Sequence, residues 1–283
     1  MKKGIQLVLL LIVLIVFGSE LFLNRVKFQD FVKEFVKTPL PKTVSYQTVV
    51  EQKKDVVPPE PTKSRQKQIT KPPSLAPQTS PASITSPAFP IEFNLSVPFT
   101  SQAPGGNWDI EAKESCEEAS LLMVKSFYEG VTSEVISSSD AKSEMLKIIA
   151  FEMQTFGYFE DTTADQTATI AEQFLGYPTS DVIENPSVDQ IKQALVNGNP
   201  VIVPAAGRML NNPYFQTPGP VYHMFVIRGY TKDNQFIVND PGTKHGQSYL
   251  YPIETVMNAM HDWNDGGEIQ EGKKAVLIIY PNN

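Results

Sequence analysis

The chain contains one cysteine among its 283 residues, so it cannot form an internal disulfide. It also lacks a His-Glu-x-x-His motif, a cysteine cluster, a Gly-x-Ser-x-Gly motif and a phosphate-loop glycine pattern. Zinc hydrolysis, serine hydrolysis and nucleotide binding therefore lack the residues that they need. We expect neither a metal nor a cofactor.

Basic charge is scarce in the C-terminal two-thirds of the chain. Residues 91–283 hold 11 Lys and Arg against 25 Asp and Glu, whereas residues 1–90 hold 13 against 6. Phosphate binding needs a basic surface, which an acidic domain does not offer. We therefore expect no nucleic acid as a partner, and we interpret the acidic excess mainly as a solvated surface.

The N-terminus is the one long apolar stretch. Lys2 and Lys3 precede a nearly unbroken apolar run over 5–17, and the segment reaches 19 residues if it is extended to Leu23. That length is close to the ~20 residues that a membrane-spanning helix needs, while the shorter run has the length of a signal-peptide core. Residues 1–24 are predicted to be a retained signal anchor, or alternatively a cleaved signal peptide, and the main domain is expected outside the cytoplasm.

The next segment, residues 25–90, is rich in proline, serine, threonine and lysine. Of the 23 prolines, 11 lie between Thr38 and Pro90. Such a stretch cannot bury enough apolar surface to offset the entropy lost on ordering. We predict a disordered tether over 25–90 and a folded domain over 91–283.

Cys116 is the candidate nucleophile. The segment from Ser115 to Glu118 has the pattern of a capping box, in which the Ser hydroxyl accepts an amide and the Glu side chain reaches back. Apolar residues follow at helical spacing, and Gly130 is a stop signal. Cys116 is thus predicted to begin an amphipathic helix, where free amides and the helix dipole would lower the pKa of its thiol. Neighbouring acidic residues would oppose this effect.

His223 is the candidate base. It lies in an apolar, β-branched segment, Val221–Ile227, which predicts a buried strand, and a second strand is expected at Gln235–Asp240. The two strands resemble an antiparallel hairpin. The remaining histidines, His245 and His261, lie in polar contexts that are typical of surface residues.

The hairpin register decides which residue orients His223. A two-residue turn pairs Phe225 with Asp240 and makes His223 the diagonal neighbour of Asp240 on the same face. An odd loop or a bulge would bring Asn239 to that face instead. Both residue types can orient an imidazole, and we favour Asp240.

Helix signals precede strand signals along the domain. Helices are expected over Asp140–Phe156 and after box-like caps at Thr163 and Ser187, and strands at Val201–Ala205 and Ala275–Tyr280. Helices followed by antiparallel strands indicate an α+β fold.

The ordered set of segments resembles the C39-like group of bacterial cysteine peptidases in the papain-like superfamily. The matching segments are Val97–Gln102, Cys116 with Ala119–Met123 and Tyr128–Gly130, His223–Tyr230, and Asp240–Pro241. The resemblance implies a papain-like fold, with the nucleophile helix packed on an antiparallel sheet. It also implies that Cys116 is the nucleophile, His223 the base and Asp240 its orienting acid, and that Gln102 and the Cys116 amide stabilise an oxyanion.

The sequence departs from the family pattern at two places. Glu117 and Glu118 stand where the family usually has Gly-Pro after the cysteine, and Tyr222 replaces the usual glycine before His223. The resemblance implies hydrolysis of peptide or amide bonds in a peptide or protein substrate, through a thioester. A catalytically silent peptide-binding module and an acyltransferase that uses the same thioester remain alternatives.

Overall fold

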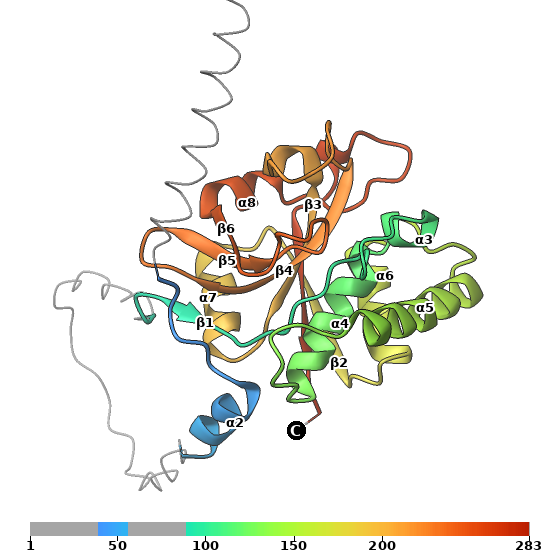
Figure 1. Cartoon of the computed structure of the whole chain (residues 1–283). Helices are drawn as coiled ribbons and strands as arrows, with labels where there is room; N and C mark the ends of the chain where they lie inside the picture. The colour runs from blue at the N-terminus through green and yellow to red at the C-terminus, as the bar shows by residue number, and fades with distance from the viewer. Residues whose placement is uncertain (1–38, 56–88, 283) are drawn as a thin grey trace, which may run out of the picture. The chain divides into compact units, whose positions relative to one another are not determined.

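The computed structural model describes residues 39–55 and 89–282 (Figure 1). The predicted signal segment at 1–24 lies outside these residues, as does most of the predicted tether. Within the described ranges, no helix is long and apolar enough to cross a bilayer.

An antiparallel sheet of seven strands forms the centre of the domain. The strands are β1 (Phe93–Asn94), β2 (Thr179–Glu184), β3 (Val201–Ala206), β4 (Tyr222–Tyr230), β5 (Gln235–Asn239), β6 (Tyr249–Pro252) and β7 (Ala275–Tyr280). Their order is β2-β7-β3-β4-β5-β6, and β1 pairs with β4. Every residue of β3 and β4 is buried, so these two strands form the middle of the hydrophobic core.

Most helices precede the central strands in the chain, and they pack against the sheet and one another. They are α2 (Tyr46–Asp55), α3 (Ile110–Lys113), α4 (Cys116–Tyr128), α5 (Ser138–Thr155), α6 (Ala164–Gln173), α7 (Val188–Val196) and α8 (Ile253–Ala259), with short 3₁₀ segments η1 (Gly207–Leu210) and η2 (Ile269–Glu271). The helix α4 packs against β4 and α5, and Figure 1 shows α4, α5 and α6 gathered together. This is an α+β fold, as predicted.

Local signals explain two of the helix boundaries directly. The predicted capping boxes are formed: Thr163 caps α6 with Gln166, and Ser187 caps α7 with Gln190. Each box satisfies backbone donors that have no partner within the helix. The glycine after α7, Gly198, has a φ of +84°, which suits a residue without a Cβ at a helix end.

The start of α4 differs from the predicted capping box. Ser115 makes no capping hydrogen bond; its hydroxyl donates instead to the carbonyl of Glu111 at 2.6 Å. Glu118 is fully buried and does not reach back to Ser115. The helix α4 is also buried on all sides, whereas the sequence predicted burial of one face. Lys125 is the one residue of α4 that is not buried. The reason is tertiary, because α4 lies between the sheet and neighbouring helices.

The β4–β5 hairpin reaches the predicted register by a different route. At the turn, Tyr230 pairs with Phe236, so the loop has an odd number of residues rather than the two expected. A register shift at Arg228 follows, and Val226 then pairs with Asn239. The odd loop and the bulge each displace the pairing by one residue, and the two displacements cancel.

Residues 41–55, predicted as part of the tether, instead fold against the domain. Val44 forms a bridge with Leu95, the ring of Tyr46 packs edge-on against two aromatic rings of α4, and Val49 is 4% exposed. The prediction of a tether rested on the composition of the whole segment 25–90. That composition does not show that a short run within the segment has enough apolar side chains to bury.

Candidate active site

Cys116 occupies the predicted position, as the first residue of α4. The first backbone bond of the helix runs from the Ala119 amide to the Ser115 carbonyl. The Cys116 amide therefore precedes the intrahelical bonds, and its hydrogen is one of the helix donors without a partner in the helix. The side chain is 6% exposed, so the sulfur is buried.

The Cys116 thiol donates a hydrogen bond to Glu117 Oε2 at 3.0 Å. Burial raises the pKa of the thiol well above its usual value, and the Glu117 and Glu118 carboxyls raise it further. The backbone N–H of Met224 opposes this shift. The net direction is opposite to the lowered pKa predicted from the helix position alone.

His223 lies on β4, and its ring is held by a carboxylate. Its Nε2 lies 2.8 Å from Asp240 Oδ1, and both side chains are buried. With Nε2 engaged, Nδ1 is the ring nitrogen left to exchange a proton. The backbone amide of the next residue, Met224, lowers the pKa of the Cys116 thiol, and the helix that begins with Cys116 packs against β4. Among the described residues no hydrogen bond joins Cys116 to His223.

The imidazole ring of His223 is also fixed by packing. The Phe215 ring lies edge-on to it, with centroids 5.3 Å apart. Gly242 leaves room for both rings, because a Cβ there would lie 2.9 Å from His223 Cε1 and from Phe215 Cε1. The ring orientation is therefore set by neighbours from two separate segments, one with Phe215 and the other with Asp240 and Gly242.

Asp240 accepts hydrogen bonds at both oxygens. Gly242 N donates to Oδ1 at 3.0 Å, while Asn212 Nδ2 and Tyr251 Oη donate to Oδ2 at 3.1 and 2.7 Å. Burial alone would raise the pKa of Asp240, but His223, Tyr251 and Gly242 outweigh burial, and the pKa lies below its usual value. Asn212 and Tyr251 were missed by sequence reasoning, because they reach Asp240 from distant segments without a local motif.

Asn239 makes different hydrogen bonds from the neighbouring Asp240. Its amide nitrogen donates to the carbonyls of Val97 and Pro98 at 3.0 and 3.2 Å, and its oxygen accepts from Ser248 N. It thus ties the β5 end to the segment that leads toward the nucleophile. Of the two alternatives at the hairpin, the structure places Asp240 against His223.

Gln102 lies near the nucleophile helix but does not present a free donor. Its Nε2 donates to the carbonyls of Ala112 and Lys113 at 3.0 and 2.8 Å. Its Oε1 is buried without a hydrogen-bond partner. Both amide hydrogens are therefore engaged in bracing α3 and the residues after it. An oxyanion donor needs a free N–H, so this arrangement differs from the one the resemblance implies.

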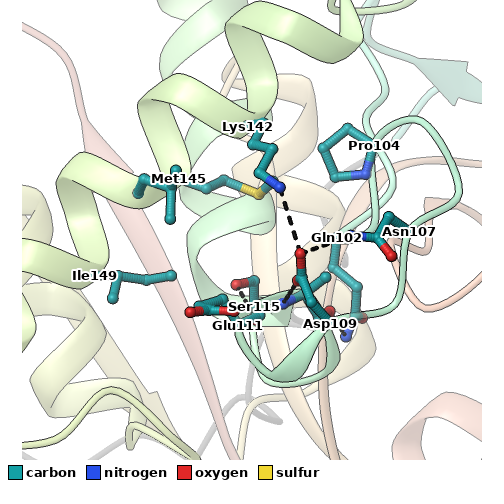
Figure 2. Close-up of a pocket in the computed structure, with 11 residues that line it drawn as sticks. Gln102, Pro104, Asn107, Asp109, Glu111, Ser115, Lys142, Met145 and Ile149 are labelled. Atoms are coloured by element: carbon teal, nitrogen blue, oxygen red, sulfur yellow. Dashed lines mark hydrogen bonds and ion pairs between the residues drawn. The ribbon is translucent and has the colours of Figure 1, made fainter.

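A pocket borders Gln102, α3 and α5 (Figure 2). Met145 and Ile149 contribute apolar surface from α5, while Asp109 and Lys142 form an ion pair at 3.4 Å. Ser115, immediately before the cysteine in the chain, also lines the pocket. The pocket therefore lies beside the N-terminal end of the nucleophile helix.

Buried carboxyls crowd the helix side of the site. Glu117, Glu118 and Glu152 are each at most 1% exposed, and four oxygens of Glu118 and Glu152 have no hydrogen-bond donor. Burial raises the pKa of Glu152 to about 7 and raises the pKa of Glu117 and Glu118 well above the usual range. Sequence reasoning missed Glu152, although its spacing from the buried Ile148 and Ile149 is that of a core-facing position.

The other two histidines lie in different surroundings. His261 Nδ1 is 3.0 Å from the carbonyl of Gly272, and the exposed His245 stacks on Tyr214 with centroids 4.3 Å apart. Neither makes a hydrogen bond to a carboxylate in the described part of the chain. Within the same residues, no group of three or more His, Cys, Asp or Glu is arranged to hold a metal ion.

The chain carries a cysteine peptidase-like domain, as comparison with known families shows. Residues 94–269 match the Peptidase_C39 like family, and the chain belongs to this family. Among solved structures, a candidate C39-like peptidase from Bacillus anthracis is similar, with 18% identity, a TM-score of 0.45, and coverage of 68% of this chain and 98% of the other. No curated protein matches the chain.

Proposed function

We propose that the domain is a cysteine peptidase or amidase in which Cys116, His223 and Asp240 act together. The observation that carries this proposal is the 2.8 Å contact of His223 Nε2 with Asp240 on a strand, β4, against which the helix that begins with Cys116 packs. A carboxylate on one ring nitrogen leaves the other for the thiol proton, which is what an activated nucleophile requires.

The reaction then follows from the placement of each group. His223 Nδ1 accepts the Cys116 proton, the sulfur attacks the substrate carbonyl, and His223 returns the proton to the leaving nitrogen. Asp240 keeps the other proton on Nε2. Water releases the acyl group from the sulfur.

The free amide of Cys116 at the start of α4 is the proposed donor to the oxyanion. Gln102 would join it only after releasing the carbonyls of Ala112 and Lys113. In the described arrangement Gln102 instead supports the segment before the nucleophile.

The proposed substrate is a peptide or protein outside the cytoplasm. This placement rests on the apolar segment at residues 1–24, which we propose anchors the chain in the cell membrane. If the segment is cleaved, the domain is secreted.

A second function is supported by the Cys116–Glu117 hydrogen bond. A thiol with a raised pKa reacts slowly, because the thiolate is the nucleophile. A catalytically silent peptide-binding module would keep its cysteine in this state permanently.

The test compares the purified full-length chain with Cys116→Ala, His223→Ala and the matched control His245→Ala on a peptide mixture, read by mass spectrometry. We expect cleavage by the wild type and by His245→Ala, and none by the other two. No cleavage by the wild type, together with iodoacetamide labelling of Cys116 that His223→Ala leaves unchanged, would establish the silent module instead. Added glycine as acceptor reveals acyl transfer if new amide products replace the free acid.

A further inference from the structure

We propose that Glu117 restrains the nucleophile: in the resting protein it binds the Cys116 thiol, which must leave Glu117 before it reacts with His223. This inference rests on the proposed function, because it concerns how the same cysteine becomes available.

The geometry of the thiol supports this role. The Sγ–Oε2 separation is 3.0 Å, and Cys116 and Glu117 are 6% and 1% exposed. A thiol has one hydrogen to donate, so the hydrogen shared with Glu117 is not available to His223 Nδ1. Water does not compete for a bond buried to this extent, which makes the contact stronger than it would be at the surface.

The surroundings of Glu117 strengthen the restraint. The ionisable groups that shift the pKa of Glu117 and Cys116, or respond to them, are acids; they are Glu118 on α4, Glu152 on α5, Asp161 between α5 and α6, and Tyr222 on β4. The base on β4, His223, is bound to Asp240 instead. In the described structure no lysine, arginine or histidine makes a hydrogen bond or ion pair with Glu117. The thiol is its one side-chain hydrogen-bond donor. Losing that donor leaves a buried polar group unsatisfied, which is unfavourable.

Activation then consists of one exchange of hydrogen bonds. Rotation about the Cα–Cβ bond of Cys116 breaks the S–H···Oε2 bond to Glu117 and forms an S–H···Nδ1 bond to His223. The proton passes from sulfur to Nδ1, and the S–H electron pair stays on sulfur as the thiolate. Glu117 keeps its own protonation state, and nothing is oxidised or reduced.

The first measurement follows alkylation of the full-length chain by iodoacetamide across the pH range, and every thiol adduct belongs to Cys116 because the chain has one cysteine. Glu117→Ala removes the acceptor, whereas Glu117→Gln keeps an acceptor oxygen and the volume. We expect Glu117→Ala to lower the pH midpoint by about one unit and to raise the rate at neutral pH by about tenfold, and Glu117→Gln to change both less. Glu129→Gln, an exposed acid just after α4, is the control and should leave the midpoint unchanged.

The second measurement is the S–H stretching band of Cys116 in the Raman spectrum, with Cys116→Ser as the blank. In the wild type we expect the lower frequency of a hydrogen-bonded thiol, and in Glu117→Ala the higher frequency of a free one. A wild-type band at the frequency of a free thiol overturns the proposal even if no Glu117 variant folds. So does a Glu117→Ala chain with an unchanged midpoint or slower alkylation.

Peptide cleavage separates this inference from the proposed function. Faster alkylation in Glu117→Ala without any cleavage by wild type or variant supports the restraint and rejects the peptidase. Cleavage by the wild type with an unchanged midpoint in Glu117→Ala rejects the restraint and supports the peptidase.

Discussion

The two sides of the site are built on opposite electrostatic principles. On the strand side, the buried carboxylate of Asp240 accepts hydrogen bonds from a ring nitrogen, a backbone amide, a side-chain amide and a phenol. On the helix side, Glu118 and Glu152 face an acidic environment, and among the described residues neither has a hydrogen-bond partner other than the carboxyl of the other. Burial is nearly complete on both sides, so the difference comes from the hydrogen-bond donors that are present.

This difference separates a rigid half from an adjustable one. The strand side holds the imidazole in one orientation, because several donors stabilise the charged carboxylate. The helix side favours protonated carboxyls, because buried charges without partners are costly. We infer that the His223 ring is positioned in advance, while the reactivity of the Cys116 thiol depends on the protonation of the acids around it.

The largest effect is expected from Asp240→Ala, which removes the centre of the strand-side network. Four donors lose their acceptor, and breaking one partner of a buried charged pair costs about 3–5 kcal/mol. Urea unfolding of the full-length chain should show a loss of this order, and Asp233→Ala, an exposed acid in the turn before β5, should show almost none. A small change in Asp240→Ala would mean that the strand side is not the more rigid half.

A smaller effect, with a pH dependence of opposite sign, is expected from Glu152→Gln. The folded-state pKa of Glu152 is raised from 4.5 to about 7, so its stabilising contribution is complete below pH 4.5 and is lost as the pH rises through about 7. This shift in pKa corresponds to roughly 3 kcal/mol in the free energy of unfolding. Melting temperatures between these pH values should therefore fall less steeply in Glu152→Gln than in the wild type.

Glu144→Gln, a partly exposed acid on the same helix, is the control for this pH dependence. The contribution of Asp240 to stability depends on pH in the opposite direction. Its pKa is lowered in the folded state, so this contribution is present above the unfolded-state pKa and is lost as the pH falls through the folded-state pKa. Parallel pH profiles for Glu152→Gln and the wild type would contradict the proposed cost of the helix-side acids.

The smallest effect is expected from Asn212→Ala, which removes one donor and leaves the rest of the strand-side network. Asn212 Nδ2 donates to Asp240 and to Tyr251, and the loss of such bonds costs about 1–2 kcal/mol. Thermal unfolding measures this cost, with the exposed Gln216→Ala from the same loop as the control. A loss as large as that of Asp240→Ala would show that the network is a single cooperative unit.

The positions of Cys116 and His223 on their secondary-structure elements were predictable from local pattern. The position of Cys116 at the start of a helix, and a strand carrying His223 beside a second strand, follow from apolar spacing and turn residues. The choice of Asp240 over Asn239 was favoured for a two-residue turn, whereas the structure reaches the same register through an odd loop and a bulge. A local rule could not foresee that these two irregularities cancel.

The sequence by itself determined the α+β order of elements, the capped helices α6 and α7, and the identity of the one possible thiol. Tertiary structure decided what each polar side chain meets: Glu118 turns into the core instead of capping Ser115, and Gln102 braces α3. The physical reason is the separation along the chain over which each interaction acts. Caps and periodicity act over a few residues, whereas burial and hydrogen-bond partners depend on which distant segments the fold brings together.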